Sequence, residues 1–199
     1  MLQLTTTERV HLGERVSEAL VMEANLLDSA RIFLLVSSTL LNTTDEIDKV
    51  KQALGDRIVC VHDGIPPHAP RSSVLAAAAK ARASSADLIV TIGGRSVTDA
   101  GKIIPLILKH ELTEHDDLEP FHVYVNDAGE TIKPEFESPD LRVICCPTTL
   151  SGGEFNPLAG ATDEKIGHKQ GFEHPMMAPV AVILDPELTR HTPAWLWTS

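Results

Sequence analysis

Continuous apolar runs are the feature of this sequence that most limits what it can fold into. Residues 32–36 (IFLLV), 88–92 (LIVTI), 143–146 (VICC) and 180–184 (VAVIL) carry no charged side chain, and each is as long as one strand. Strands that are apolar on both faces are typical of a parallel sheet with helices on both sides. The runs therefore predict the interior strands of an α/β fold.

Helical segments separate these runs. Residues 14–27 have apolar side chains at helical spacing, and the alanine-rich residues 72–84 have strong helix propensity. Residues 43–46 (TTDE) read as a capping box for a helix ended by Gly55, and residues 57–62 as another strand. The alternation predicts a Rossmann-like, mostly parallel sheet with flanking helices. The acidic residues 111–119 and the turn at residues 63–67 are expected to be loops.

Composition excludes some partners. The formal charge is −11, with 28 acidic residues against 17 lysines and arginines, so we expect no nucleic-acid partner. Apolar runs such as residues 178–184 are far shorter than the roughly 20 residues of a membrane span, and the amino-terminal residues have no secretory signal pattern. Of three cysteines, Cys145 and Cys146 are adjacent and should point to opposite faces of a strand. They read as small buried residues of a reducing, cytoplasmic protein.

The first candidate site is a glycine turn between a strand and a helix. The segment from Gly93 to Lys102 (GGRSVTDAGK) follows the apolar run 88–92 directly. Ligands of α/β sheets lie at the carboxyl ends of strands, where backbone amides and a helix amino terminus can bind a phosphate. Ser96 is expected to cap the helix or donate to a phosphate oxygen. The segment matches neither common phosphate-loop fingerprint, so an ordinary strand-to-helix turn remains the alternative.

The second candidate site follows the run at residues 143–146. Residues 147–154 (PTTLSGGE) contain three hydroxyl groups and two glycines, which suit phosphate or ribose oxygens. Alone, this segment is equally compatible with a flexible loop. Two such loops at the carboxyl edge of one sheet favour a shared dinucleotide or phosphate cleft.

Other polar residues support no site. His110 and His115 are five residues apart, about 140° on a helix, and cannot share a metal as an i, i+4 pair does. We interpret both as solvated loop residues. The polar segment containing residues 163–165 and Lys169 reads as a solvated face.

Together the two loops resemble the motifs of the iron-containing alcohol dehydrogenases. Residues 93–102 resemble that family's G-G-G-S-x-x-D-x-A-K motif, and residues 147–154 its P-T-T-x-x-(G/S)-x-E segment. The residues TDE at 162–164, VILDP at 182–186 and TP at 192–193 continue the family's order. The L-S-G-G-E form of the second loop is most similar to the maleylacetate reductase branch.

The resemblance implies an oxidoreductase that uses NAD or NADP and a divalent metal, iron or zinc. It implies a nucleotide-binding domain over residues 1–185 and the start of a helical domain over residues 186–199. In the family the metal ligands lie past the T-P segment, beyond Ser199. The expectation is thus the cofactor half of such an enzyme, without a metal ligand. The implied substrate is a small alcohol, aldehyde or keto acid, and a homodimer is compatible with the family.

The resemblance also assigns roles to the residues of the loops. Gly93, Gly94 and Ser96 are expected at the pyrophosphate of the cofactor, and Thr148 and Thr149 at a phosphate or on the adenosine side.

Three further residues complete this set. Asp99 is expected near the nicotinamide end of the cleft, Ser151 at the nicotinamide ribose, and Lys169 at a ribose hydroxyl. No catalytic residue is assigned.

Departures from the family motif bear on the cofactor. Arg95 replaces a glycine and would cost on the order of 1 kcal/mol if its φ had to be positive, although an arginine can instead pair with a phosphate. Gly101 replaces an alanine, which weakens a helix by about 1 kcal/mol. Ser37 and Ser38 stand where the family often has an acidic residue that selects NAD, so NAD and NADP both remain open.

Two other functions stay open at this point. One is a stand-alone nucleotide-binding module without catalysis. The other is a lyase of the dehydroquinate synthase type, which has a similar cofactor domain and ranks lower because of the L-S-G-G-E loop.

Overall fold

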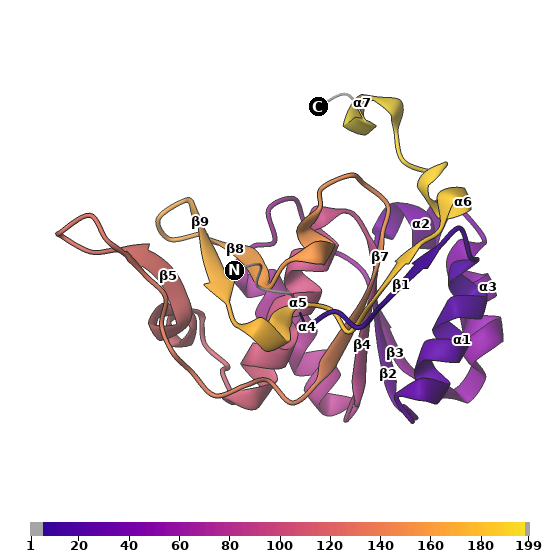
Figure 1. The fold of residues 1–199 in the computed structure, drawn as a ribbon, viewed down its shortest axis with the longest axis horizontal. Coiled ribbons are helices and arrows are strands. Elements are labelled where there is room, and N and C mark those ends of the chain that lie inside the picture. Colours follow the sequence, from indigo (N-terminus) through magenta and orange to yellow (C-terminus); the bar gives the residue numbers. More distant parts are fainter. Residues whose placement is uncertain (1–5, 198–199) are drawn as a thin grey trace.

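The computed structural model describes residues 6–197 and contains two sheets with helices around the larger one (Figure 1). The strands are β1 (Arg9–Leu12), β2 (Ile32–Val36), β3 (Ile58–His62), β4 (Leu88–Gly93), β5 (His122–Val125), β6 (Thr131–Ile132), β7 (Arg142–Pro147), β8 (Leu158–Asp163), β9 (His168–Glu173) and β10 (Ala181–Leu184). The helices are α1 (Val16–Leu26), α2 (Ser38–Thr43), α3 (Glu46–Leu54), α4 (Arg71–Ala83), α5 (Arg95–Lys109), α6 (Pro186–Thr189) and α7 (Ala194–Trp197). Four short 3₁₀ helices are η1 (Gly55–Arg57), η2 (His115–Phe121), η3 (Gly153–Phe155) and η4 (Pro175–Met177).

The six-stranded sheet confirms the predicted α/β fold. Its order is β1-β10-β7-β4-β2-β3, and every neighbouring pair is parallel. Every residue of β2 and β4 is buried, which is why their sequences are apolar without alternation.

Helices cover both faces of this sheet (Figure 1). On one face α4 and α5 pack over side chains such as Phe33 and Ile89, and on the other α1 and α3 pack over Leu34 and Val90. Adjacent Cys145 and Cys146 point into these two different cores, as predicted, and both thiols are free and buried. Burial raises the pKa of the Cys145 thiol to about 12, so this thiol stays protonated.

The strand order creates a switch point beside β2. The chain passes from β2 outward to β3 and then returns to β4 on the other side of β2. Connections that leave neighbouring strands in opposite directions open a crevice at the strands' carboxyl ends. The crevice lies where the first predicted loop begins.

The second sheet was not predicted. It is four-stranded and antiparallel, with the order β6-β5-β9-β8. Strand β9 (HKQGFE) is polar and partly exposed, and β5 (HVYV) and β8 (LAGATD) are short strands with exposed positions, so none of the three shows a long apolar run. The acidic residues 111–119 are also not all loop, because η2 begins at His115 with a capping box between Glu114 and Asp117.

The start of the helix expected after residues 43–46 differs in detail. Thr43 belongs to α2, a helix that was not predicted, and Asp45 occupies the N-cap of α3 without a side-chain hydrogen bond. Thr44 Oγ1 accepts a hydrogen bond from Glu46 N–H at 3.3 Å, so the predicted reciprocal capping box is absent.

Across residues 6–197, no helix has the length and apolar character needed to cross a membrane. The predicted division at residue 185 falls just after β10 and before the short helices α6 and α7. That α6 begins a second domain stays a prediction.

Candidate functional site

Three loops meet at the carboxyl edge of the parallel sheet, after β2, β4 and β7. Ser37 N–H donates to Ile92 O at 2.8 Å, which joins the loop after β2 to the end of β4. Thr148 N–H donates to Gly93 O at 3.0 Å, which joins the loop after β7 to the glycine turn. The two predicted loops are thus hydrogen-bonded neighbours.

The glycines of the turn are needed for close approach. A Cβ on Gly93 would lie 2.9 Å from Val97 Cγ2, closer than carbon atoms pack. A Cβ on Gly94 would lie 3.3 Å from Thr149 Cγ2 in the facing loop. A side chain at Gly93 would force Val97 to shift, and one at Gly94 would crowd Thr149 in the facing loop.

Helix α5 begins at this turn. Gly94 is its N-cap, so the expectation that Ser96 caps the helix is wrong. Ser96 Oγ instead accepts a hydrogen bond from His68 N–H at 2.9 Å, which leaves its hydroxyl proton free to donate. Val97 and Thr98 donate their amides to Gly94 O at 3.0 and 3.1 Å. The amides of Arg95 and Ser96, ahead of them in this 15-residue helix, have no acceptor within it and carry partial positive charge, so this end of α5 suits an anion.

The structure bears on both departures from the family motif. Arg95 lies in the first turn of α5 and is not among the residues with positive φ, so it brings no backbone strain. Gly101 is required where it stands, because a Cβ there would lie 2.0 Å from Thr91 Cγ2 on β4. Helix α5 packs closely on the sheet at this point.

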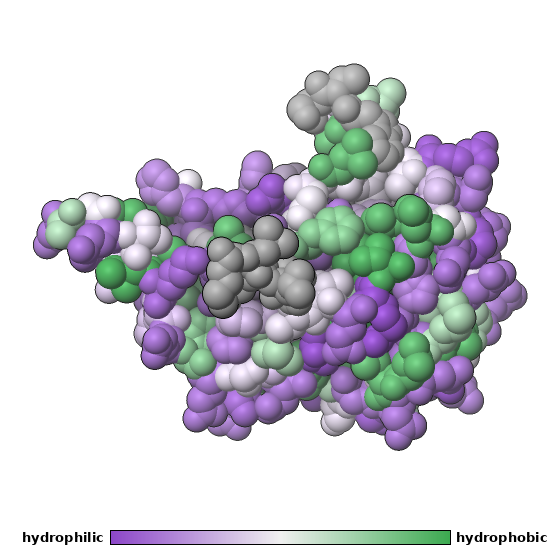
Figure 2. Space-filling view, in the orientation of Figure 1, coloured by the Kyte–Doolittle hydropathy of each residue, from purple (hydrophilic) through white to green (hydrophobic). Residues whose placement is uncertain are grey.

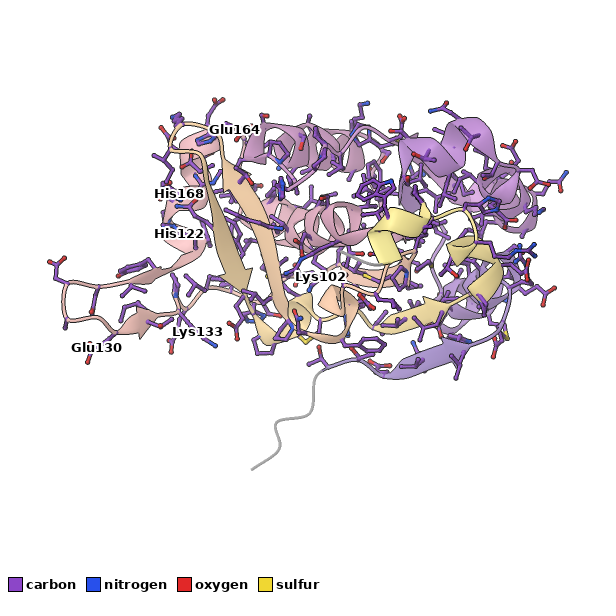
Figure 3. The ribbon with its side chains drawn as sticks, turned by 90° about the horizontal axis from the view of Figure 1, so that it is seen from above. Lys102, His122, Glu130, Lys133, Glu164 and His168 are labelled. Atoms are coloured by element: carbon purple, nitrogen blue, oxygen red, sulfur yellow. The ribbon has the colours of Figure 1, made fainter. Side chains whose placement is uncertain are left out.

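A buried lysine holds the second loop against α5. Lys102 is fully buried, and its Nζ donates to Gly153 O at 2.7 Å, Leu158 O at 2.6 Å and Asn156 Oδ1 at 3.3 Å. Burial lowers the pKa of Lys102 below its ordinary value. Figure 3 shows Lys102 in the middle of the molecule.

A charged pair lies behind the loop. Asp99 on α5 is buried and accepts a hydrogen bond from Lys169 Nζ at 2.7 Å. Arg95 Nε lies 3.6 Å from the same carboxylate. Lys169 is therefore an ion-pair partner of the predicted site, and Asp163, at 3 % exposure, is buried. The interpretation of residues 163–165 and Lys169 as a solvated face was wrong for Asp163, whereas Lys169 is exposed even though it forms this ion pair.

The loops enclose a groove made of two adjoining hollows, both lined by Gly94, Thr149, Trp195 and Leu196. The larger has a volume of about 650 Å³ and is also lined by Ile65, Pro67, His68, Arg95, Ser96, Val97, Leu150 and Ser151. The smaller, of about 230 Å³, is also lined by Ser37, Thr39, Leu40, Thr148, His191, Thr192 and Pro193.

The groove brings together most of the predicted site residues. Gly94, Ser96, Thr149 and Ser151 line one hollow, and Thr148 lines the other. Gly93, Asp99 and Lys169 line neither hollow.

Other groove residues were missed. Among them, His68 lies in a strained stretch, because His68 and Ala69 both have positive φ, 67° and 50°. Lys102, which holds the second loop, was not predicted as a site residue either. The sequence does mark it, because it is the only charged residue between Asp99 and Lys109. Nothing in the sequence pointed to His68, because its place depends on the fold.

The two histidines interpreted as solvated are partly buried. His110 packs against the ring of Phe121, with centroids 4.7 Å apart. His115 Nε2 lies 3.2 Å from Asp163 Oδ1 and 3.4 Å from Glu164 Oε2. Within residues 6–197, no group of three or more histidines, cysteines or acidic residues is arranged to hold a metal ion.

The parallel sheet, its switch point and the two loops define an α/β domain of the kind that binds ligands at the carboxyl edge of its sheet. Residues 7–186 match the iron-containing alcohol dehydrogenase family. The chain belongs to this family.

Curated relatives agree with this assignment. The chain is 38 % identical over 183 residues to dehydrogenase FUM7 of Gibberella moniliformis (strain M3125 / FGSC 7600), covering 88 % of this chain and 42 % of the relative. It is 31 % identical over 185 residues to maleylacetate reductase of Burkholderia cepacia, covering 93 % and 42 %. The chain therefore spans about two fifths of the length of these relatives.

Solved structures show the same fold. Sulfoacetaldehyde reductase from Bifidobacterium kashiwanohense, in complex with NAD+, superposes with a TM-score of 0.82 at 19 % identity, over 98 % of this chain and 49 % of that one. Maleylacetate reductase from Rhizobium sp. strain MTP-10005 superposes with a TM-score of 0.72 at 26 % identity, over 96 % and 45 %.

Proposed function

We propose that this chain is the cofactor-binding part of an NAD(P)-dependent oxidoreductase that acts on the CH–OH group of an alcohol or reduces a maleylacetate-like keto acid. The observation that carries the proposal is the groove between the loops after β4 and β7. Both hollows lie where α/β domains bind ligands, and Gly94 and Thr149 line both. The family assignment supplies the reaction class.

The residues of the groove fit a dinucleotide. Thr149 Oγ1 is buried and has no hydrogen-bond partner within the described residues, and such a group gains by meeting a ligand oxygen. Gly94, Ser96 and the first turn of α5 would hold the pyrophosphate. Thr148 and Thr149 would lie at a phosphate or on the adenosine side, and Ser151 at the nicotinamide ribose.

Asp99 and Lys169 act from behind the groove in this proposal. Their ion pair fixes Lys169 on β9 beside α5, from where it would reach a ribose hydroxyl. The bound nicotinamide ring supplies the hydride-transfer chemistry, while these residues orient it. The metal of the family has no matching ligand set within residues 6–197, so no step through a metal is derived for this chain.

Calorimetric titration with NAD+, NADH, NADP+ and NADPH tests the proposal. We expect one cofactor site per chain. Thr149→Val should weaken the binding affinity about tenfold, because a methyl group of nearly the same volume replaces the hydroxyl and its hydrogen bond to the cofactor is lost. Thr131→Val on the exposed β6 is the matched control and should bind as the wild type does. No binding of any of the four nucleotides to the folded chain would overturn the proposal.

Both cofactors should bind. The smaller hollow begins at Ser37, and none of the residues lining it is acidic. A carboxylate directly after β2, where Ser37 stands, would bind the ribose 2′-hydroxyl of NAD and repel the 2′-phosphate of NADP. We propose that its absence admits either nucleotide.

Ser37→Asp tests the cofactor choice. Ser37 is the N-cap of α2, where aspartate and asparagine are equally suitable, so the fold should tolerate both. We expect Ser37→Asp to weaken NADP+ binding at least about tenfold through charge repulsion, with little effect on NAD+. The neutral control Ser37→Asn should change neither affinity, and an equal loss of both nucleotides in Ser37→Asp would contradict the proposal.

The alternative that the sequence left open is a nucleotide-binding module without catalysis of its own. A dehydrogenase assay of this chain with added iron or zinc separates the two. Turnover at the level of a complete family enzyme would exclude the module and show that the chain itself supplies the metal ligands.

A further inference from the structure

Most of the net negative charge of the chain comes from one segment, which we call the acidic arm (residues 111–140). It contains ten acidic residues and one lysine, a formal charge of −9 out of −11 for the whole chain. The arm comprises η2 and the β5–β6 hairpin, which projects from one end of the molecule (Figures 1 and 3). Figure 3 shows Glu130 at the tip of the hairpin and His122 at its base.

Part of this charge is neutralised at the base of the arm. Arg71 lies 2.9 Å from Glu119, and Lys109 lies 2.9 Å from Asp140.

Farther out the charge is not paired. Asp127, Glu130 and Glu135 are exposed and make no ion pair with any residue between 6 and 197. The one lysine of the arm, Lys133, pairs with Glu173 on β9 instead. The arm thus presents net negative charge to its surroundings.

An apolar hollow of about 500 Å³ lies among these charges. It is lined by Glu119, Pro120, His122, Tyr124, Ile132 and Pro134. His122 and Tyr124 are two residues apart on β5 and so share a face, and Ile132 lies opposite Tyr124 in the strand register. The Tyr124 side chain is 47 % exposed. None of these residues lines the groove at the carboxyl edge.

The apolar lining of the hollow and the unpaired carboxylates around it together determine what could bind there. An apolar side chain would bury the exposed ring of Tyr124 and the face of Ile132, while lysine or arginine side chains beside it would meet the unpaired carboxylates. A tyrosine face also attracts a cation directly. Nucleic acid is repelled by the charge, and a second copy of this chain would bring two negative arms together.

We propose that the acidic arm is a docking surface for a basic segment of another protein, with an apolar side chain of that segment seated against Tyr124. The surface is separate from the cofactor groove, so it is independent of the proposed reaction. Electrostatic attraction would speed the encounter, and the hollow would supply the specificity.

Selection from a displayed library of random peptides of about twelve residues tests the proposal. We expect the full chain to enrich peptides with net positive charge and at least one large apolar residue. Their affinity, measured by fluorescence anisotropy, should fall when NaCl is raised from about 50 mM to about 500 mM. Enrichment of neutral or acidic peptides, or no enrichment, would overturn the proposal.

Matched variants locate the binding surface. The triple variant Asp127→Asn/Glu130→Gln/Glu135→Gln should weaken the enriched peptides about tenfold, as expected for three exposed charge pairs. The control Asp28→Asn/Asp48→Asn/Asp56→Asn makes the same change of charge on exposed residues outside the arm and should bind nearly as the wild type does. Equal weakening by both variants would reduce the effect to net charge and overturn the assignment to the arm.

The hairpin offers a second matched pair. Tyr124 and Val125 are adjacent, exposed and on opposite faces of β5. Tyr124→Ala should weaken the peptides more than about fivefold, whereas Val125→Ala should have little effect. Sedimentation velocity adds a check, because self-association that is lost in Tyr124→Ala would assign the hollow to a second copy and contradict the proposal.

Discussion

The two sheets of this molecule are stabilised in different ways. The parallel sheet buries β2 and β4 completely between two layers of helices. The antiparallel sheet contributes Ala159, Ala161 and Phe172 to the core beside α4 and α5. It is also joined to these helices by buried charges, above all Arg71 on α4 and the Asp99–Lys169 pair. The comparison indicates an apolar frame that carries the loops of the groove, and a second layer whose attachment combines a small apolar contact with several buried polar ones.

Replacing Arg71 should have the largest effect on the difference in stability between the two sheets. Its guanidinium is fully buried and donates to Glu119 Oε1 at 2.9 Å, to His115 O at 3.2 Å and to Gln170. Arg71→Met leaves these acceptors without their cation, and we expect a loss of about 3–5 kcal/mol in the free energy of unfolding.

Hydrogen exchange shows where that loss falls. Amides of β8 and β9 should exchange much faster in Arg71→Met, relative to those of β2 and β4, than in the wild type. Arg190→Met, at an exposed arginine on the surface, is the control with little expected effect. Uniform acceleration in both sheets would show that they unfold as one unit.

The next effect lies inside the frame. Gly101→Ala should destabilise the chain by about 1–3 kcal/mol, because the new Cβ overlaps Thr91 Cγ2. The double variant Gly101→Ala/Thr91→Ser removes that methyl group and should recover most of the loss. Chemical denaturation measures both. A single variant more stable than the wild type, as helix propensity alone predicts, would contradict the close packing of α5 on β4.

The smallest effect concerns the edge strand β1. Burial would lower the pKa of His11, but hydrogen bonds to Glu23 at 2.7 Å and Glu14 at 2.9 Å outweigh it and raise that pKa above 6.5. Burial would raise the pKa of Glu23, but Arg9 and His11 lower it below 4.5.

The two shifts define a pH window. His11 stabilises the fold fully below its unfolded pKa, and the contribution is lost as the pH rises through its higher folded pKa. Glu23 contributes above its unfolded pKa, and its contribution is lost as the pH falls through its lower folded pKa. The attachment of β1 to α1 should therefore be strongest in mildly acidic solution. In the His11→Gln variant, the loss of stability as the pH rises through the folded pKa of His11 should disappear. The pH dependence of thermal unfolding measures this, and a profile equal to that of the wild type would contradict the role of His11.

The same contrast explains what could be predicted from the sequence. Strands such as Ile32–Val36 can be predicted from the sequence, because burial on both faces requires an uninterrupted apolar run. Strand β9 lacks such a run because its side chains face solvent and ion-pair partners. The charged residues of such a strand do not indicate, from the sequence alone, which residues of other elements will form ion pairs with them.

The site follows the same rule. Gly94, Ser96 and Thr149 could be predicted to share a groove, because loops after neighbouring parallel strands meet at one edge of the sheet. The contact between Ser96 and His68 could not, since it depends on where the loop after β3 returns. The ordering of the second loop by Lys102 likewise appears only once the elements are packed.

The central claim is that the loops after β4 and β7 bind one nicotinamide nucleotide between them. Amide chemical shifts of the labelled chain, followed while NADH is added, test it most directly. The account predicts that the amides of Gly94, Ser96 and Thr149 shift together along one binding curve, while that of Tyr124 on the acidic arm stays in place. Shifts confined to one loop, or absent from both, would contradict it.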